Sequence, residues 1–432
     1  MSIRLIGGDC RDVLATLPAN SVHCVVTSPP YWNLRDYGTA QWAGGDAACD
    51  HQQPTGQRQD VGRAGVDGFN GSSLISDLKQ RQYRDTCGKC GATRVDRQIG
   101  LEPTPDAYLA EMVRVFREVK RVLHPTGSVF CNMGDSYLDK QLLMMPARLA
   151  LALQADGWWL RSDIIWHKPN PMPESVTDRP TSAHEHVFLL ARSSRYYYDA
   201  DAVREDAQLS TIERDNYRRT GYAKEAGGVG AVNYLNPNSG EFRSCSGRNL
   251  RNVWTIATAP YSEAHFATFP PALAERCIRA GTSERGCCAA CGAPWVRVVE
   301  RSFDHEAAAQ IRLRRSVAYD ASRHDPEFHQ LSGIEKGRLA SSVDRGFAPS
   351  CACDAATVPC TVLDPFAGAG TTLLVADRLQ RDAIGIELNP DYTRMAMARC
   401  RDDAPLFASP PPAEDPEEAR IRDLFAEPLA AD

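Results

Sequence analysis

The sequence predicts an α/β protein built on a mostly parallel β-sheet with helices on both faces. Runs of β-favouring residues alternate with segments of helical periodicity over much of the 432-residue chain. The alternation is clearest near the C-terminus, where strand 361–366, a glycine turn, helix 372–379, strand 383–388 and helix 390–401 follow one another. Because two parallel strands need a crossover connection, usually a helix, this order favours a parallel sheet.

The first elements of the chain follow the same logic. The first predicted strand, residues 21–27, is rich in β-favouring residues and stops at a pair of prolines. Thr104 is a suitable N-cap, and Pro105 a suitable first residue, for a helix that ends at the His-Pro-Thr-Gly sequence beginning at His124. The apolar residues of this helix recur at helical spacing: Leu109, Met112, Val113, Phe116, Val119 and Leu123.

Shorter elements are predicted between this helix and the C-terminal units. They are the strands 128–133, 159–166 and 186–191, the helix 146–155, and a helix that follows Pro270 and Pro271 and reaches residue 279.

Three stretches interrupt the α/β pattern: residues 41–100, 199–260 and 282–356. The first and the last carry paired cysteines and few apolar residues, whereas the middle one is rich in arginine, asparagine, glycine and tyrosine. After residue 402 the composition changes again, to a segment rich in proline, alanine and acidic residues that predicts a disordered tail. This tail carries the net charge of −6, so the rest of the chain is close to neutral, which permits a nucleic-acid partner without indicating one.

The composition also predicts the compartment. The N-terminal residues carry aspartates and no long apolar run, and no stretch approaches the roughly 20 apolar residues of a membrane helix, so we expect a cytoplasmic protein without a membrane partner. In such a protein the fifteen cysteines favour metal sites or buried thiols over disulfides.

The glycine turn near the C-terminus predicts a nucleoside-binding loop. Gly368 and Gly370 lie between a strand and a helix, and Glu387 ends the next strand. Glycines allow the backbone to approach a ligand closely, and a carboxylate in this place can bind both hydroxyls of a ribose. Thr372 stands where a pyrophosphate site would want a third glycine, so an adenosine ligand without phosphates is favoured.

A second motif, Thr-Ser-Pro-Pro-Tyr-Trp, directly follows the strand 21–27. Two prolines fix the backbone, so that the Ser28 hydroxyl and the Pro29 carbonyl can face one point. These two acceptors match the two N–H donors of an exocyclic amine, and Tyr31 offers a face on which a base turned out of the helix can stack.

Together, TSPPYW and LDPFAGAGTT resemble the motifs of the DNA amino-methyltransferases, the family that makes N4-methylcytosine or N6-methyladenine. The catalytic motif comes before the cofactor motif, which resembles the circularly permuted β class of that family. The resemblance covers the α/β blocks and implies a Rossmann-like fold that depends on S-adenosylmethionine (AdoMet), with a mostly parallel seven-stranded sheet.

The resemblance also implies which residues act. The target base would be held by Ser28, Pro29, Pro30 and Tyr31. The cofactor would be bound by Asp9, Phe266, Asp364, Phe366, Gly368, Gly370, Thr371 and Glu387.

The implied reaction is direct transfer of a methyl group to the amine, without a covalent enzyme intermediate. Serine at position 28 favours N4 of cytosine, and N6 of adenine stays open as the alternative. Transfer to cytosine C5 would need an activated thiolate; Cys360 follows a proline but lies before the cofactor strand, so we interpret it as a buried or metal-adjacent thiol. The motif order disfavours a protein or RNA substrate, and the intact motifs disfavour a catalytically dead zinc-ribbon DNA-binding protein.

The paired cysteines predict two structural zinc sites, because tetrahedral zinc takes thiolate and imidazole ligands at such spacings. Both sites lie in inserts with few apolar residues, so the metal would supply folding energy. In the second site, Cys287 can replace Cys288. The predicted ligands are Cys49, His51, Cys87 and Cys90 in the first site and Cys288, Cys291, Cys351 and Cys353 in the second.

The middle insert is the predicted target-recognition region, because its arginine and asparagine side chains suit contacts with phosphates and base edges of double-stranded DNA. Candidates are Arg243, Arg248, Asn249 and Arg251. A partner restriction endonuclease, a monomeric or homodimeric state, and a bacterial or phage origin all stay open.

These interpretations divide the chain into eight segments. They are the catalytic core 1–40, a zinc-knuckle insert 41–100, a second core part 101–198, the target-recognition insert 199–260, a core segment near AdoMet 261–281, a zinc-ribbon insert 282–356, the AdoMet-binding core 357–402 and the acidic tail 403–432.

Overall fold

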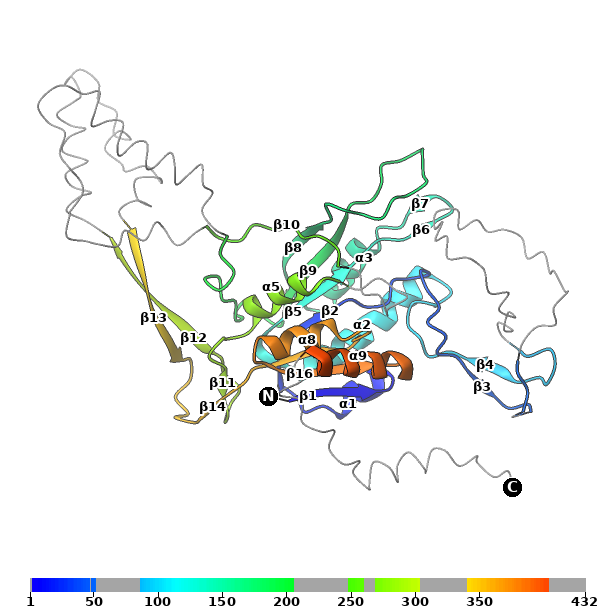
Figure 1. Cartoon of the computed structure of the whole chain (residues 1–432), viewed down its shortest axis with the longest axis horizontal. Helices are drawn as coiled ribbons and strands as arrows, with labels where there is room; N and C mark the ends of the chain where they lie inside the picture. Colours follow the sequence, from blue (N-terminus) through cyan, green and yellow to red (C-terminus); the bar gives the residue numbers. More distant parts are fainter. Residues whose placement is uncertain are drawn as a thin grey trace, which may run out of the picture.

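A computed structural model describes residues 2–46, 48–51, 86–205, 248–259, 269–303 and 340–403. Its centre is one twisted sheet, in the order β1-β16-β15-β2-β5-β9-β8-β10 (Figure 1). The strands are β1 Ile3–Gly7, β16 Asp382–Glu387, β15 Thr361–Asp364, β2 Val22–Thr27, β5 Leu123–Met133, β9 His184–Ala191, β8 Trp159–His167 and β10 Val253–Thr255.

The strands β1, β16, β15, β2 and β5 pair in parallel, and only β9 runs against its two neighbours. The predicted mostly parallel sheet is therefore confirmed. It has eight strands in the described residues rather than the predicted seven, because β10 adds to β8 at one edge. This strand falls within the range 199–260, which we assigned to an insert.

Helices cover both faces of the sheet. On one face lie α1 Cys10–Thr16, α2 Pro105–Val122 and α3 Met145–Ala155, and on the other lie α5 Pro271–Gly281, α8 Thr371–Arg378 and α9 Pro390–Asp403. Strand β2 is buried on both faces, because Val25 packs with the first set of helices and its neighbours Cys24 and Val26 with the second. As predicted, Thr104 caps α2, accepting a hydrogen bond from the Ala107 N–H at 3.2 Å.

Strand β5 begins at Leu123, five residues before the predicted start. Leu123 pairs with Val22, and the register then shifts before Ser128 pairs with Cys24. A proline is tolerated at such an irregularity, because the missing N–H falls where regular pairing is interrupted. Strand β1 and helix α1 were not predicted, since the N-terminal residues are too few to show a period; β1 owes its place to parallel pairing with β16.

Four two-stranded sheets extend from the core: β3 Gln41–Ala43 with β4 Thr93–Val95, β6 Tyr137–Leu138 with β7 Gln141–Leu142, β11 Cys287–Cys288 with β14 Thr357–Val358, and β12 Trp295–Phe303 with β13 Ala340–Pro349. Figure 1 shows the β3–β4 and β12–β13 pairs on opposite sides of the molecule. The tail beyond residue 403 and most of the predicted recognition insert lie outside the described residues. Within the described parts, no helix combines the length and the apolar character that crossing a membrane requires.

Candidate active site and cofactor-binding edge

The two sequence motifs meet at one edge of the sheet, where the parallel strands end; we call it the carboxyl edge. Strands β2 and β15 are neighbours, with Cys24 beside Val362, so the loops that follow them start side by side. The Thr27 hydroxyl donates a hydrogen bond of 2.6 Å to Asp364 Oδ1 and joins the ends of the two strands. In sheets of this type, ligands bind outside the carboxyl ends of the strands, and this edge is the candidate active site.

The catalytic motif is held by a group of polar side chains from three strands. The Tyr31 hydroxyl donates to Glu185 Oε2 at 2.8 Å and lies 3.2 Å from Ser28 Oγ. Asn132 Nδ2 donates to Glu185 Oε2 at 2.7 Å and to the Tyr31 oxygen at 3.0 Å. The other oxygen of Glu185 accepts a hydrogen bond from Lys168, so the carboxylate is neutralised and fixed.

The direction of this hydrogen-bond chain follows from the protonation of Tyr31. Burial and the nearby Glu185 carboxylate hold the pKa of the Tyr31 phenol well above its usual value, so its proton stays on and faces Glu185. The Ser28 hydroxyl can then donate to the Tyr31 oxygen. Ser28 Oγ also accepts a long hydrogen bond of 3.4 Å from Asn132 Nδ2, which leaves one lone pair to accept from a ligand.

Two further contacts fix this loop. The Tyr108 hydroxyl of α2 donates to the Pro30 carbonyl at 2.9 Å, and Pro29 is buried. The Tyr31 ring packs so closely on the backbone at Gly134 that a Cβ there would come within 2.8 Å of the ring. The motif is therefore a rigid turn whose conformation is set from both sides.

The site residues predicted from the sequence did not include Asn132, Lys168 and Glu185. Each lies at the carboxyl edge: Asn132 near the end of β5, Lys168 just after β8, and Glu185 near the start of the reversed strand β9. A polar residue directly after the apolar run 129–131 of β5 was the available signal for Asn132. The Oδ1 atom of Asn132 is buried and has no hydrogen-bond partner among the described residues, as expected of a group that meets a ligand.

The glycine loop and Glu387 form the candidate cofactor site. Glu387 accepts a 2.8 Å hydrogen bond from the Gly368 N–H on one carboxylate oxygen and another of 2.8 Å from the Asn389 N–H on the other. Burial raises the pKa of Glu387. Each carboxylate oxygen keeps a lone pair for a ribose hydroxyl. Gly370 has φ +73°, and a Cβ there would lie 2.8 Å from the Ala396 side chain, so this position requires glycine.

Other predicted cofactor residues support the glycine loop through packing and hydrogen bonds. Asp364 is fully buried; its carboxylate accepts from the Thr27 and Thr372 hydroxyls and from the Phe366 N–H. Burial raises its pKa to about 6. The Phe366 side chain packs on the core, and the buried Thr371 hydroxyl accepts from an arginine of α9 at 2.9 Å. These residues shape the loop, whereas Gly368 and Glu387 are placed to touch a ligand.

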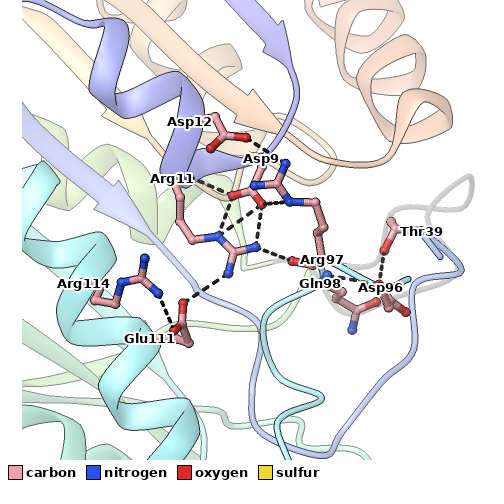
Figure 2. A network of polar contacts seen from close by, with 9 residues as sticks. All are labelled: Asp9, Arg11, Asp12, Thr39, Asp96, Arg97, Gln98, Glu111 and Arg114. Atoms are coloured by element: carbon pink, nitrogen blue, oxygen red, sulfur yellow. Dashed lines mark hydrogen bonds and ion pairs between the residues drawn. The ribbon is translucent and has the colours of Figure 1, made fainter. Parts of the chain in front are cut away.

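Asp9 lies at the same edge but is occupied by protein contacts (Figure 2). It caps α1 by accepting from the Arg11 N–H at 2.9 Å, and its carboxylate pairs with the guanidinium groups of Arg11 and Arg97 at 2.5 and 3.0 Å. Burial opposes ionisation of Asp9, but the bonds from Arg11 outweigh it and the pKa lies below its usual value. Phe266, the remaining predicted cofactor residue, lies outside the described residues.

The first cysteine cluster has the dimensions of a zinc site. Cys49 Sγ lies 3.8 Å from Cys87 Sγ, and Cys90 Sγ lies 3.6 Å from His51 Nδ1. With Zn–S and Zn–N bonds of about 2.3 and 2.0 Å, the edges of a zinc tetrahedron measure about 3.8 Å between two sulfurs and about 3.5 Å between sulfur and nitrogen. The four side chains therefore fit the metal.

In the second cluster the sulfurs of Cys288, Cys291, Cys351 and Cys353 all lie within 4.8 Å of one another. Cys288 is thus the ligand candidate. Its neighbour Cys287 turns the other way, to His23 and the buried Cys360. We do not assign a metal to this third group, because His23 already accepts from the Thr361 N–H on Nδ1 and bonds the Gly292 carbonyl through Nε2. Cys360 precedes β15, at the edge opposite the catalytic motif.

The described ends of the recognition insert carry two of the candidate arginines. Arg248 and Arg251 both pair with Glu205, at 2.6 and 3.1 Å, and their side chains remain 41% and 63% exposed. Hydrogen bonds from Arg251 and Arg248 lower the pKa of Glu205 to about 2. The two arginines can therefore bind a phosphate only in competition with the Glu205 carboxylate. Arg243 lies outside the described residues.

A mostly parallel sheet covered on both faces, with a Ser-Pro-Pro-Tyr turn and a glycine loop at one edge, is typical of the Rossmann-like methyltransferases. Comparison with known proteins is more specific. A family model described as DNA methylase, N6_N4_Mtase, matches residues 22–289 and 360–398. The chain belongs to this family of N4/N6 DNA amino-methyltransferases.

Several relatives match nearly the whole chain. The Type II methyltransferase M.Cfr9I of Citrobacter freundii is 30% identical over 424 residues, which cover 91% of this chain and 86% of that protein. The Type II methyltransferase M.SmaI of Serratia marcescens is 28% identical, covering 92% of this chain and 90% of that protein.

Solved structures with similar folds include a putative DNA modification methylase of Thermus thermophilus complexed with S-adenosyl-L-methionine. It shares 21% identity and covers 94% of this chain and 97% of its own, with a TM-score of 0.42. The cytosine-N4-specific PvuII DNA methyltransferase shares 15% identity and covers 98% of this chain and 90% of its own, with a TM-score of 0.45.

Proposed function

We propose that the protein binds AdoMet and methylates N4 of cytosine in double-stranded DNA, after the target base has turned out of the helix. The observation that carries the proposal is the hydrogen-bond chain from Ser28 through Tyr31 to Glu185 at the same edge as Gly368 and Glu387. It leaves an oxygen acceptor for an exocyclic amine beside a loop that fits a nucleoside. The Type II names of the relatives support a role in restriction-modification.

The residues divide the work between binding and orientation. Glu387 would accept from the ribose hydroxyls, and Gly368 would allow the ligand to approach the backbone. When bound, AdoMet supplies an electrophilic methyl group. Ser28 and the Pro29 carbonyl would accept from the amine, aim its lone pair and stabilise the positive charge that grows on nitrogen. The unpartnered Asn132 Oδ1 is a further acceptor within this group, as far as the described residues go.

Tyr31 would serve in two ways. Its hydroxyl orients Ser28, and its ring would stack on the extruded base, which repays part of the cost of unstacking. Neither role needs a strong nucleophile. The buried Cys131 near this edge has a pKa raised by burial to about 12, so it stays protonated and is unsuited to covalent attack on a base.

One experiment identifies the product. The purified protein is incubated with labelled AdoMet and mixed DNA, and the DNA is digested to nucleosides for mass analysis. We expect labelled N4-methyldeoxycytidine. N6-methyldeoxyadenosine would select the alternative base within the same mechanism, whereas 5-methyldeoxycytidine, or no methylation by a protein that binds DNA, would refute the proposal.

We also propose that both cysteine clusters hold structural zinc. The tetrahedral edge lengths in the first cluster support this, and so does the low apolar content of both inserts. Elemental analysis should give two zinc atoms per chain, and serine at Cys351 and Cys353 should remove one of them. A preparation with full methyltransferase activity and well below two zinc atoms would contradict the assignment.

A further inference from the structure

We propose that the first cysteine cluster sets the affinity of the protein for AdoMet, acting through residues 96–98, which we call the bridging segment. Gln98 is the positioning residue in this segment. The inference rests on the proposed function, because it concerns the cofactor site assigned above. It assigns to a zinc-binding insert a role in cofactor binding rather than in DNA contact alone.

The bridging segment is joined directly to the cysteine cluster. Cys87 and Cys90 lie just before β4, and the bridging segment comes just after it. Strand β4 pairs with β3, whose Trp42 stacks on the candidate ligand His51 with the ring centres 4.4 Å apart. If the cluster becomes disordered, both strands and the bridging segment that follows them therefore lose a support.

Gln98 holds the loop that follows the catalytic motif. Its side chain is 8% exposed, and both ends of the amide bond the backbone of this loop: Oε1 accepts from the Tyr37 N–H at 2.7 Å, and Nε2 donates to the Arg35 carbonyl at 2.6 Å. Asp96 adds a third bond, accepting from the Thr39 hydroxyl at 3.1 Å. No other side chain type provides this donor and acceptor pair in the same geometry as well as an amide.

The same loop contacts the residues assigned to the cofactor. Asn389 Nδ2 donates to the Tyr37 carbonyl at 3.1 Å, and the Asn389 N–H donates to Glu387 Oε1 at 2.8 Å. The Tyr37 and Tyr392 rings meet edge to face with centres 6.3 Å apart. Gln98 is thus connected to the ribose-binding carboxylate through one loop residue and one asparagine.

A second connection runs through Arg97 (Figure 2). Its guanidinium pairs with Asp9 at 3.0 Å and Asp12 at 2.9 Å, and its carbonyl accepts from Arg11 at 2.8 Å. These acidic residues follow β1, which pairs with the cofactor strand up to Glu387. The bridging segment therefore holds two sides of the candidate cofactor site.

The second cysteine cluster provides a natural contrast, because it lies at the opposite edge of the sheet. The carbonyls of Cys291 and Gly292 bond the rings of His124 and His23, at 3.2 and 3.0 Å, near the start of β5 and β2. Strand β11 of this insert pairs with β14, just before β15 begins. These contacts are one full strand length away from Glu387.

The size of the effect follows from the population of the ordered edge. Apparent affinity falls by the fraction of molecules in which the binding-competent arrangement is formed. Removing the two buried hydrogen bonds of Gln98 costs on the order of one factor of ten in such an equilibrium. Saturating AdoMet restores the ordered state, so the KM for AdoMet should rise, by at most about tenfold, while kcat changes little.

The test compares the full-length wild type with three variants, using calorimetric titration with AdoMet and steady-state kinetics. Gln98→Met keeps the side-chain length and removes both hydrogen bonds. Cys87→Ser with Cys90→Ser removes the first metal site, and Cys351→Ser with Cys353→Ser is the matched control at the opposite edge. We expect AdoMet binding weakened by at most about tenfold in Gln98→Met, weakened in the Cys87/Cys90 variant and unchanged in the third variant, with loss of one zinc atom in each double variant.

Two results would overturn the inference: wild-type AdoMet affinity in Gln98→Met, or equal weakening in the control at the opposite edge. If the Cys87/Cys90 variant does not fold, Gln98→Met still decides, because it leaves all zinc ligands in place. A wild-type chain that binds no AdoMet refutes the proposed function itself. A wild-type chain that binds AdoMet, together with unaffected variants, refutes only the role of the bridging segment.

Discussion

The buried carboxylate of Asp364 gives a quantitative prediction. It lies beneath the glycine loop, and Asp364→Asn preserves its shape. The side-chain oxygen of asparagine can still accept from the Thr27 hydroxyl and the Phe366 N–H. The new NH2 group can donate to the Thr372 hydroxyl oxygen. The Thr372 hydroxyl can in turn donate to the Val26 carbonyl, which lies 3.1 Å away. The substitution therefore removes the buried charge while leaving the hydrogen bonds largely satisfied.

The magnitude follows from the pKa. Burial raises the Asp364 pKa from 3.8 to about 6, and two pKa units correspond to about 3 kcal/mol. Because the folded protein holds this proton to higher pH than the unfolded chain, the contribution of Asp364 to stability is greatest below pH 3.8 and is lost as the pH rises to about 6. In the variant, position 364 does not ionise, so the free energy of unfolding does not fall in this way. The stability of the variant relative to wild type should therefore increase with pH.

The assay is chemical denaturation of wild type and Asp364→Asn at several values between pH 5 and 7.5. The free energy of unfolding of the variant, relative to wild type, should rise by about 1.5 kcal/mol over this range, roughly half of the full effect. Any constant change in hydrogen bonding cancels in this comparison. Parallel curves for the two proteins would show that Asp364 does not carry a raised pKa, and would refute the account of a buried charge under the loop.

Three further predictions concern the catalytic turn, the proposed recognition insert and the second cysteine cluster. Tyr31→Phe removes the phenol that orients Ser28, so kcat should fall by one to two factors of ten with AdoMet affinity unchanged; normal kcat would contradict the orienting role. In anisotropy titrations over a range of salt concentrations, Glu205→Gln should tighten DNA binding, whereas alanine at Arg248 and Arg251 should weaken it. If both variants change the DNA affinity in the same direction, these arginines do not contact DNA. Gly292→Ala places a side chain at φ +73° and should lower the free energy of unfolding by about 1 kcal/mol or more, so equal stability would mean that this turn can change its conformation.

Much of the fold could be predicted because several helices and strands carry their own signals. The strand of buried valines before the prolines, the capped helix from Thr104 and the strand-turn-helix around Gly368 all appear near the expected places. The short strands β1 and β10 could not be predicted. Their three to five residues acquire a strand conformation only by pairing with β16 and β8, and pairing partners are distant in sequence.

The candidate site shows the same division. Motif residues such as Ser28 and Glu387 were predicted because each stands in a run whose chemistry is distinctive. Glu185 and Lys168 were missed, because their importance comes from meeting Tyr31 across strands. The hydrogen bond from the Thr27 hydroxyl to Asp364 could not be predicted for the same reason, since the two residues are 337 positions apart in the sequence.

The attachment of the insert that carries the second cysteine cluster, at the edge where the strands begin, has an evolutionary consequence. The stacked rings of His23 and His124, 5.6 Å apart, anchor an appendage whose strand β12 alone has nine residues and spans about 30 Å. Because this attachment lies at the edge of the sheet opposite the candidate active site, the appendage can lengthen, shorten or be exchanged without displacing the catalytic motif. Members of the family are therefore expected to vary more in this appendage than around Ser28.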